Sequence, residues 1–132
     1  MAEADIRSRR PLSPHLQIYK LIPTMIMSIL HRLTGMALYF GVLLVLWWVA
    51  AAAAGAQAYG FASAVLTSWF GLLVLFGFTW ALIHHMLGGI RHLVWDTGRL
   101  MDKEMSTRLA WATLAGSAIL TLLLWLVVGL SG

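Results

Sequence analysis

The sequence of 132 residues contains no cysteine, and only 11% of its residues are charged. The absence of cysteine excludes a disulfide framework, a zinc site built from thiolates and an iron–sulfur cluster ligated by this chain. A metal ion bound here must therefore use histidine or oxygen ligands. Hydrophobic residues make up 61% of the chain, well above the share in a soluble globular domain. The composition indicates an integral membrane protein whose surface faces lipid or partner subunits.

The few charged residues leave two long stretches of the chain without any charge. Residues 33–90 and residues 109–132 contain no Asp, Glu, Lys or Arg. About 20 helical residues cross the hydrocarbon core of a bilayer, so the first stretch is long enough for two spans and the second for one. We therefore predict an all-α membrane bundle of three transmembrane helices that forms a single domain. The predicted spans are residues 24–50, 66–93 and 108–130.

The segments that connect the predicted spans differ in charge. Residues 50–59, between the first two spans, are small and uncharged, and we expect a short turn there. Segment 1–23 and loop 94–107 carry most of the basic residues. By the positive-inside rule, we expect both of these segments in the cytoplasm and the C-terminus in the periplasm. Pro23 is expected to mark the start of the first helix.

The start of the sequence has some features of a cleavable leader, with basic residues, an apolar run and small residues at 51–58. The apolar run is too long for a signal peptide, so we expect no cleavage. There is also no Arg- and Ser-rich amphipathic transit segment, which favours the inner membrane of a bacterium over import into a mitochondrion.

Near the start of the first predicted span, a short segment combines a hydroxyl, an imidazole and a guanidinium. Ser28, His31, Arg32 and Gly35 have the spacing of one helix face. Polar groups near hydrocarbon are costly, so such a set indicates a ligand or a partner. These groups can hydrogen-bond a quinone carbonyl oxygen or pair with a carboxylate such as a haem propionate. Alternatively, Arg32 extends to the lipid headgroups and His31 only lies at the membrane interface.

The second predicted span ends with two adjacent histidines and two glycines. His85 shares a helix face with Gly88, Gly89 and His92. A histidine in a membrane helix can serve as an axial ligand of haem iron, and glycines one turn away leave room for a flat macrocycle. His84 also shares a face with Gly88, so the spacing leaves both histidines open as ligands. Alternatively, the glycines allow close helix packing and the histidines hydrogen-bond across helices.

Two further regions carry polar residues. The loop after the second span has mixed charge, which is usual for a solvated connection and also suits docking of a soluble subunit. The residues of this loop cluster are Trp95, Asp96, Arg99, Asp102, Lys103 and Glu104. The third span has only hydroxyl groups near its middle, and we expect it to be a packing helix. These hydroxyl residues are Thr113, Ser117 and Thr121.

Two parts of the sequence match the signatures of one known family. The first part is RPLSPHL at residues 10–16 followed by SILHRLTG at residues 28–35. The second part is HMLGGIRHLVWD at residues 85–96. Both parts, in this order, resemble the cytochrome b556 subunits (C subunits) of succinate dehydrogenase, respiratory complex II. The resemblance covers the whole chain, because those subunits also have three membrane spans.

The resemblance implies particular roles for the polar residues. It implies that His85, rather than His84, is one axial ligand of a haem b. The second axial histidine would come from a hydrophobic companion anchor subunit. It also implies that Ser28 and Arg32 help form a ubiquinone site near the cytoplasmic face, and that His31 and Arg32 lie near the haem propionates.

The resemblance further implies a membrane-anchoring cytochrome b subunit of succinate:quinone oxidoreductase. In such a complex, succinate is oxidised on a soluble flavoprotein subunit, and an iron–sulfur subunit on the cytoplasmic face passes electrons on to quinone. This chain itself would carry no succinate-oxidising site and no catalytic residue, and no nucleic-acid partner is expected. Two alternatives are the anchor of a quinol:fumarate reductase, and a non-redox scaffold or transporter subunit whose histidines only pack.

Overall fold

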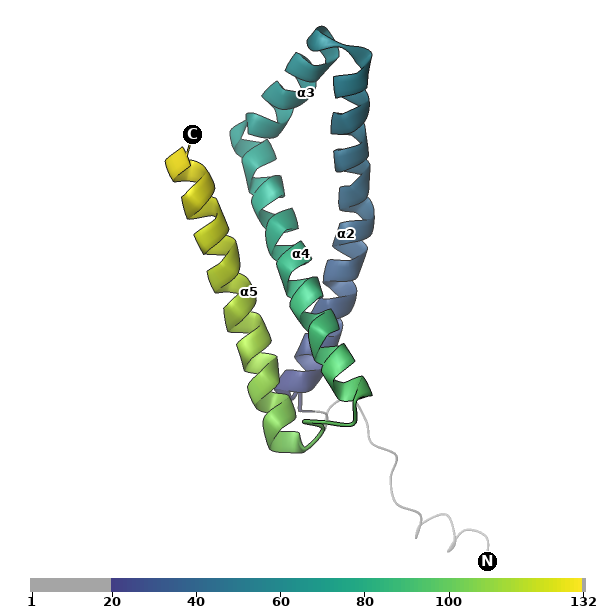
Figure 1. Cartoon of the computed structure of the whole chain (residues 1–132), viewed down its shortest axis with the longest axis vertical. Helices are drawn as coiled ribbons and strands as arrows, with labels where there is room; N and C mark the ends of the chain where they lie inside the picture. The colour runs from purple at the N-terminus through teal and green to yellow at the C-terminus, as the bar shows by residue number, and fades with distance from the viewer. Residues whose placement is uncertain (1–19, 132) are drawn as a thin grey trace, which may run out of the picture.

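The computed structural model describes residues 20–131 and arranges them in four helices (Figure 1). Helix α2 is Pro23–Ala54, α3 is Ala56–Thr67, α4 is Trp69–Asp96 and α5 is Lys103–Ser131. Helices α2, α4 and α5 are each long and apolar enough to cross a membrane. The predicted all-α bundle of three transmembrane helices is therefore confirmed.

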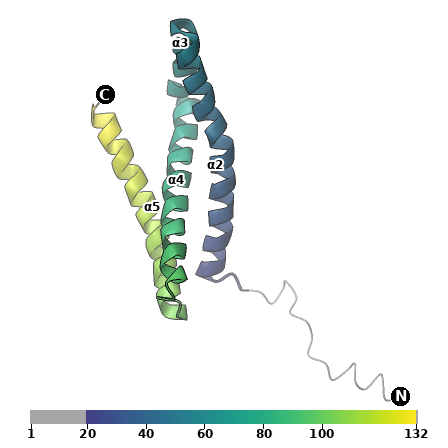
Figure 2. The same ribbon diagram turned by 45° about the vertical axis from the view of Figure 1, so that its right-hand side comes forward.

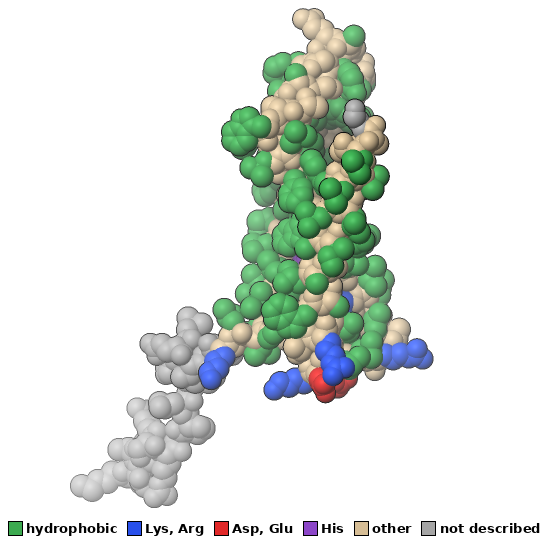
Figure 3. Space-filling model, turned by 90° about the vertical axis from the view of Figure 1, so that its left-hand side faces the viewer, with side chains coloured by type: hydrophobic (Ala, Val, Ile, Leu, Met, Phe, Trp, Pro, Cys, Tyr) green, Lys and Arg blue, Asp and Glu red, His purple; other side chains and the backbone are tan. Residues whose placement is uncertain are grey.

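Charged side chains gather at one end of the bundle, and the remaining surface in this view is mostly hydrophobic (Figure 3). That end contains the start of α2, the end of α4 and the start of α5, whereas α3 lies at the other end (Figure 1). This position of the charged side chains agrees with the sequence, in which residues 33–90 and 109–132 carry no charge. The cytoplasmic location of the charged end remains a prediction, and the motif at residues 10–16 lies outside the described residues.

Helix α4 lies between α2 and α5 and packs against both (Figure 2). Several of the buried positions are small residues, including Gly41, Ala81, Gly88 and Ala110. Small residues let membrane helices approach closely, while large apolar side chains face lipid or partners. The hydroxyl residues of the third span are all buried, which confirms α5 as a packing helix. They are Thr113, Ser117 and Thr121.

The connection between the first two spans is largely helical. The chain turns at Gly55, whose φ of 114° lies in the region that favours glycine. The residues that follow form helix α3, so the expected turn over residues 50–59 is confined to Gly55. The physical reason is that alanine, which dominates this segment, has the highest helix propensity of all residues.

A second bend, at Ser68, separates α3 from α4. Ser68 has an extended backbone, and its hydroxyl accepts a hydrogen bond from the Gly71 N–H at 3.1 Å, which caps α4. A Cβ at position 71 would collide with the backbone carbonyl oxygens of Val65 and Leu66. The bend therefore requires glycine at this position, and α4 begins at Trp69 rather than at residue 66 as expected.

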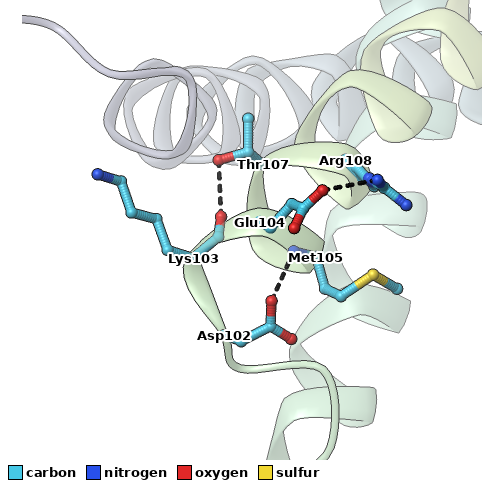
Figure 4. Close-up of polar contacts among 6 residues, drawn as sticks. All are labelled: Asp102, Lys103, Glu104, Met105, Thr107 and Arg108. Carbon is cyan, nitrogen blue, oxygen red and sulfur yellow. Dashed lines mark hydrogen bonds and ion pairs between the residues drawn. The ribbon is translucent and has the colours of Figure 1, made fainter.

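Helix α5 begins at Lys103, before the expected residue 108, because the loop supplies a cap. The Asp102 carboxylate accepts a hydrogen bond from the Met105 N–H at 2.9 Å (Figure 4). Glu104 and Arg108, one turn apart, form an exposed ion pair at 2.6 Å (Figure 4). The Asp102 carboxylate of the loop thus caps the start of α5.

Candidate functional site

The imidazole rings of His31 and His85 stack between α2 and α4. Their centroids are 4.0 Å apart and their planes differ by 5°. Gly88 of α4 makes room for His31, because a Cβ there would lie 2.5 Å from His31 Nδ1. Gly35 of α2 makes room for His85, because a Cβ there would lie 2.9 Å from His85 Cε1. The space beside Gly88, expected from the sequence to suit a macrocycle, is thus occupied by an imidazole. A Cβ at Gly89 would instead meet no atom of a neighbouring element within 4 Å among the described residues.

Hydrogen bonds determine which nitrogen of His85 carries the proton. Its Nδ1 lies 3.1 Å from the backbone carbonyl oxygen of His31 and 3.4 Å from Thr34 Oγ1. A carbonyl oxygen can only accept, so Nδ1 must donate. The Thr34 hydroxyl donates its own hydrogen to the Leu30 carbonyl oxygen at 2.8 Å and can therefore accept from His85 as well. The neutral ring is left with a lone pair on Nε2, the arrangement usual for a metal-binding histidine.

The Nε2 atom of His85 has no hydrogen-bond partner within residues 20–131 and is not fully enclosed. Sequence reasoning gave Thr34 no role, although its position three residues after His31 could have indicated that it faces the same helix contact. The structure shows that Thr34 is buried and helps orient His85.

His84 lies on another side of α4 and packs against α5. Its side chain is only 1% exposed, and its Nδ1 lies 3.1 Å from Ser117 Oγ. The Ser117 hydroxyl donates to the Leu114 carbonyl oxygen at 2.9 Å, so it accepts from His84. The Trp80 ring lies beside the imidazole, with a centroid distance of 5.1 Å. His84 therefore forms a hydrogen bond between two helices. This is one of the two roles that the sequence left open for these histidines.

Ser28 and Arg32 have exposed side chains, whereas His31 is turned toward α4. The four residues expected on one face thus lie on two adjoining sides of α2. His31 and Gly35 lie on the side that packs against α4, and Ser28 and Arg32 lie on an outer side. The outer side is open to a ligand or to another subunit.

His92 extends the pair of stacked imidazoles toward the charged end of the bundle. Its ring centroid lies 5.2 Å from that of His31 and 5.2 Å from that of Trp95. These contacts join His31, His85 and His92 in one cluster beside α4. Within the described part of the chain, no group of three or more His, Asp or Glu residues is arranged to hold a metal ion. The cluster therefore offers single ligands and hydrogen-bond donors rather than a complete metal site.

The fit of His31 against Gly88 leads to a test of the α2–α4 contact. Gly88→Ala is expected to displace the imidazole and to lower the free energy of unfolding by about 1–3 kcal/mol, the usual cost of overpacking. Gly77→Ala is the matched control, because a Cβ there has no neighbour within 4 Å among the described residues. Thermal unfolding of the purified protein in detergent measures both effects. Equal unfolding temperatures for the two variants would contradict the tight contact.

Comparison with known proteins places the chain among membrane subunits of a respiratory enzyme. Residues 6–124 match the family model described as succinate dehydrogenase/fumarate reductase transmembrane subunit. The chain is 43% identical over 125 residues to the succinate dehydrogenase cytochrome b556 subunit of Paracoccus denitrificans, covering 94% of this chain and 96% of that protein. The cytochrome b556 subunit of Rickettsia prowazekii is 37% identical over 121 residues, covering 92% of this chain and 94% of the relative.

A mitochondrial relative is also similar. The succinate dehydrogenase cytochrome b560 subunit of Sus scrofa is 37% identical over 99 residues, covering 72% of this chain and 57% of that protein. The family and the three apolar helices together show a multi-pass membrane protein that is part of an oxidoreductase complex. The resemblance seen in the sequence is confirmed. This chain belongs to the succinate dehydrogenase/fumarate reductase transmembrane subunit family.

Proposed function

We propose that this chain is the membrane-anchoring cytochrome b subunit of a succinate:quinone oxidoreductase. In this proposal it binds haem b through His85 and contributes Ser28 and Arg32 to a ubiquinone site. The observation that carries the proposal is the geometry of His85, whose Nδ1 donates to the His31 carbonyl oxygen while Nε2 has no hydrogen-bond partner among residues 20–131. The cytochrome b names of the relatives support a haem in the complex.

The residues around His85 fit an axial ligand of haem iron. The His31 carbonyl and Thr34 fix the tautomer and the ring orientation, as the outer hydrogen bonds of metal-ligating histidines do. This chain would supply one imidazole, and a histidine of the hydrophobic companion anchor subunit would supply the second. A haem b held by two imidazoles would supply electron transfer rather than oxygen binding.

His31 and Arg32 are suited to hold the carboxylates of a haem. His31 Nδ1 is buried and has no hydrogen-bond partner within residues 20–131, so Nε2 is the atom of this ring that can donate to a ligand. The guanidinium of Arg32 is exposed on the adjoining side of α2. Its positive charge would offset a propionate, and its N–H groups would hydrogen-bond it.

Ser28 and Arg32 also present donors that a quinone carbonyl oxygen accepts. They lie one helical turn apart on the outer side of α2, in the half of this helix nearer the charged end of the bundle. In the proposed reaction, two electrons come from succinate through the flavoprotein and iron–sulfur subunits. Two protons from the cytoplasmic side complete the reduction of ubiquinone to ubiquinol.

The charged end of the bundle would lie in the cytoplasm of a bacterium and receive the iron–sulfur subunit. Its basic residues support this orientation through the positive-inside rule, with the C-terminus in the periplasm. The relatives from Paracoccus denitrificans and Rickettsia prowazekii support a bacterial inner membrane. The mixed charge of loop residues 97–102 suits contact with a soluble subunit.

Copurification tests the proposed function. The tagged chain, isolated in mild detergent, is expected to bring with it a flavoprotein, an iron–sulfur protein and a second hydrophobic subunit, identified by mass spectrometry. The preparation should reduce ubiquinone with succinate. Faster oxidation of quinol by fumarate would assign the chain to a quinol:fumarate reductase instead, and the absence of a flavoprotein would indicate a non-redox scaffold.

A further inference from the structure

Arg91 is a buried charged residue whose hydrogen bonds are incomplete. The side chain is 6% exposed, and its Nε and Nη1 atoms have no hydrogen-bond partner among residues 20–131. Its guanidinium carbon lies 5.0 Å from the centre of the Trp95 ring, a cation–π contact that stabilises the charge but accepts little from the N–H groups. A guanidinium is charged at any physiological pH, and a buried charge without a hydrogen-bonded counterion is costly. Arg91 therefore has the properties of an anion-binding group.

Arg91 lines a groove of about 290 Å³ between α4 and α5. Apart from Arg91 and Thr113 the walls are apolar, and they include Leu87, Leu109 and Leu120. Leu109 and Leu120 are eleven residues apart on α5, so the groove extends for about 16 Å along that helix. It thus runs from a cation near the charged end of the bundle toward the apolar middle of the membrane.

The groove is separate from the proposed haem and quinone site. Arg91 follows His85 by six residues, which places it about 120° around α4 at 100° per residue. It shares instead the side of α4 that carries His84, which contacts Ser117 of α5. Within residues 109–131, α5 contains no carboxylate that could neutralise Arg91.

With the end of α4 at the membrane surface, Arg91 would lie at the depth of the lipid headgroups. Arg91 lies five residues before Asp96, the last residue of α4, which is about 7.5 Å along the helix. The polar headgroup region of a bilayer is about 5–7.5 Å thick on each side. Nε and Nη1 are enclosed, so Nη2 is the guanidinium nitrogen that can donate to a phosphate oxygen at this level.

We propose that this groove binds one phospholipid, with the lipid phosphate paired to Arg91 and an acyl chain against the apolar walls of α4 and α5. A basic group between membrane helices with an apolar groove below it has the two parts that a phospholipid needs. A soluble phosphate ion would use only the guanidinium and leave the apolar groove without an occupant. The site goes beyond the proposed electron-transfer function and does not depend on it.

Native mass spectrometry of the complete complex, purified in mild detergent, tests the site. The wild-type complex is expected to retain a phospholipid whose occupancy falls at least tenfold in Arg91→Gln. Arg108→Gln is the matched control, because that guanidinium is exposed at the same end and already paired with Glu104; it should retain the lipid. The mass of the bound molecule distinguishes a phospholipid from a free phosphate ion. Binding of phosphate alone would overturn the proposal.

A second variant fills the groove without removing the charge. A Cβ at Gly116, which also lines the groove, would meet Leu87 at an ordinary 3.5 Å, so the backbone accepts a side chain there. Gly116→Leu is expected to expel the lipid while the subunits stay together. If Arg91→Gln fails to assemble, this variant still tests whether a lipid occupies the groove. Retention of the lipid in Gly116→Leu would overturn the proposal. Loss of the companion subunit in Arg91→Gln, with the lipid unaffected in Gly116→Leu, would show that Arg91 pairs with a partner carboxylate instead.

Discussion

Replacing His85 with alanine is expected to abolish or strongly shift the b-type absorption of the purified complex. The substitution removes the imidazole whose Nδ1 is held at 3.1 Å by the His31 carbonyl oxygen. The haem would then lose the one ligand that this chain supplies. Because the loss of an outer-shell partner alone lowers metal affinity about 10- to 100-fold, the loss of the ligand should lower haem content by more than tenfold. A reduced-minus-oxidised difference spectrum, normalised to flavin, measures the change.

His84 is the matched control for this substitution, since it is the adjacent histidine in the same helix. His84→Ala removes the hydrogen bond to Ser117 and leaves a cavity between α4 and α5. The expected result is a stability loss of roughly 2–4 kcal/mol with the haem spectrum retained. A normal spectrum in His85→Ala together with a lost band in His84→Ala would assign the ligand to His84 and contradict the proposal.

Arg32→Ala is expected to slow ubiquinone reduction while succinate oxidation by an artificial soluble acceptor stays normal. A hydrogen bond from a charged donor contributes about 1.5–3 kcal/mol, which corresponds to roughly 10- to 150-fold in rate. Ser28→Ala removes a neutral hydroxyl and should have the smaller effect, from about twofold to about tenfold. The ratio of the two activities in the same preparation measures both variants.

Arg108→Ala provides the control for charge removal at this end of the bundle. Arg108 is exposed and pairs with Glu104 of its own helix, so both activities should stay near their wild-type values. If Arg32→Ala instead lowers both activities equally, the defect lies in assembly. That outcome would count against a role of Arg32 at the quinone.

The three membrane helices were predictable from charge alone, because uncharged stretches of known length can cross a bilayer only a limited number of times. The structure of the connection between the first two spans was not predictable from the sequence. Its alanine-rich segment is compatible with a turn or a helix, and the bend at Ser68 depends on how Gly71 fits against the carbonyl oxygens of Val65 and Leu66. Such contacts are three-dimensional and leave only a glycine as a signal in the sequence.

The candidate site was predictable as a set of residues but not as an arrangement. Spacing places His84 and His85 about 100° apart on a helix. It does not say which of them faces α2, because that depends on how α4 packs between its neighbours. The structure directs His85 to His31 and His84 to Ser117. The burial of Arg91 also depends on helix packing, so the sequence did not predict it. An arginine near a helix end is expected to reach the headgroups unless a neighbouring helix covers it.

The reduced-minus-oxidised spectrum of the wild-type complex, with succinate as the reductant, tests the central proposal most directly. If His85 and a companion histidine hold haem b in the path of electrons from succinate, a b-type band should appear after succinate is added. An intact complex that oxidises succinate and shows no b-type band, with succinate or with a strong chemical reductant, would contradict it.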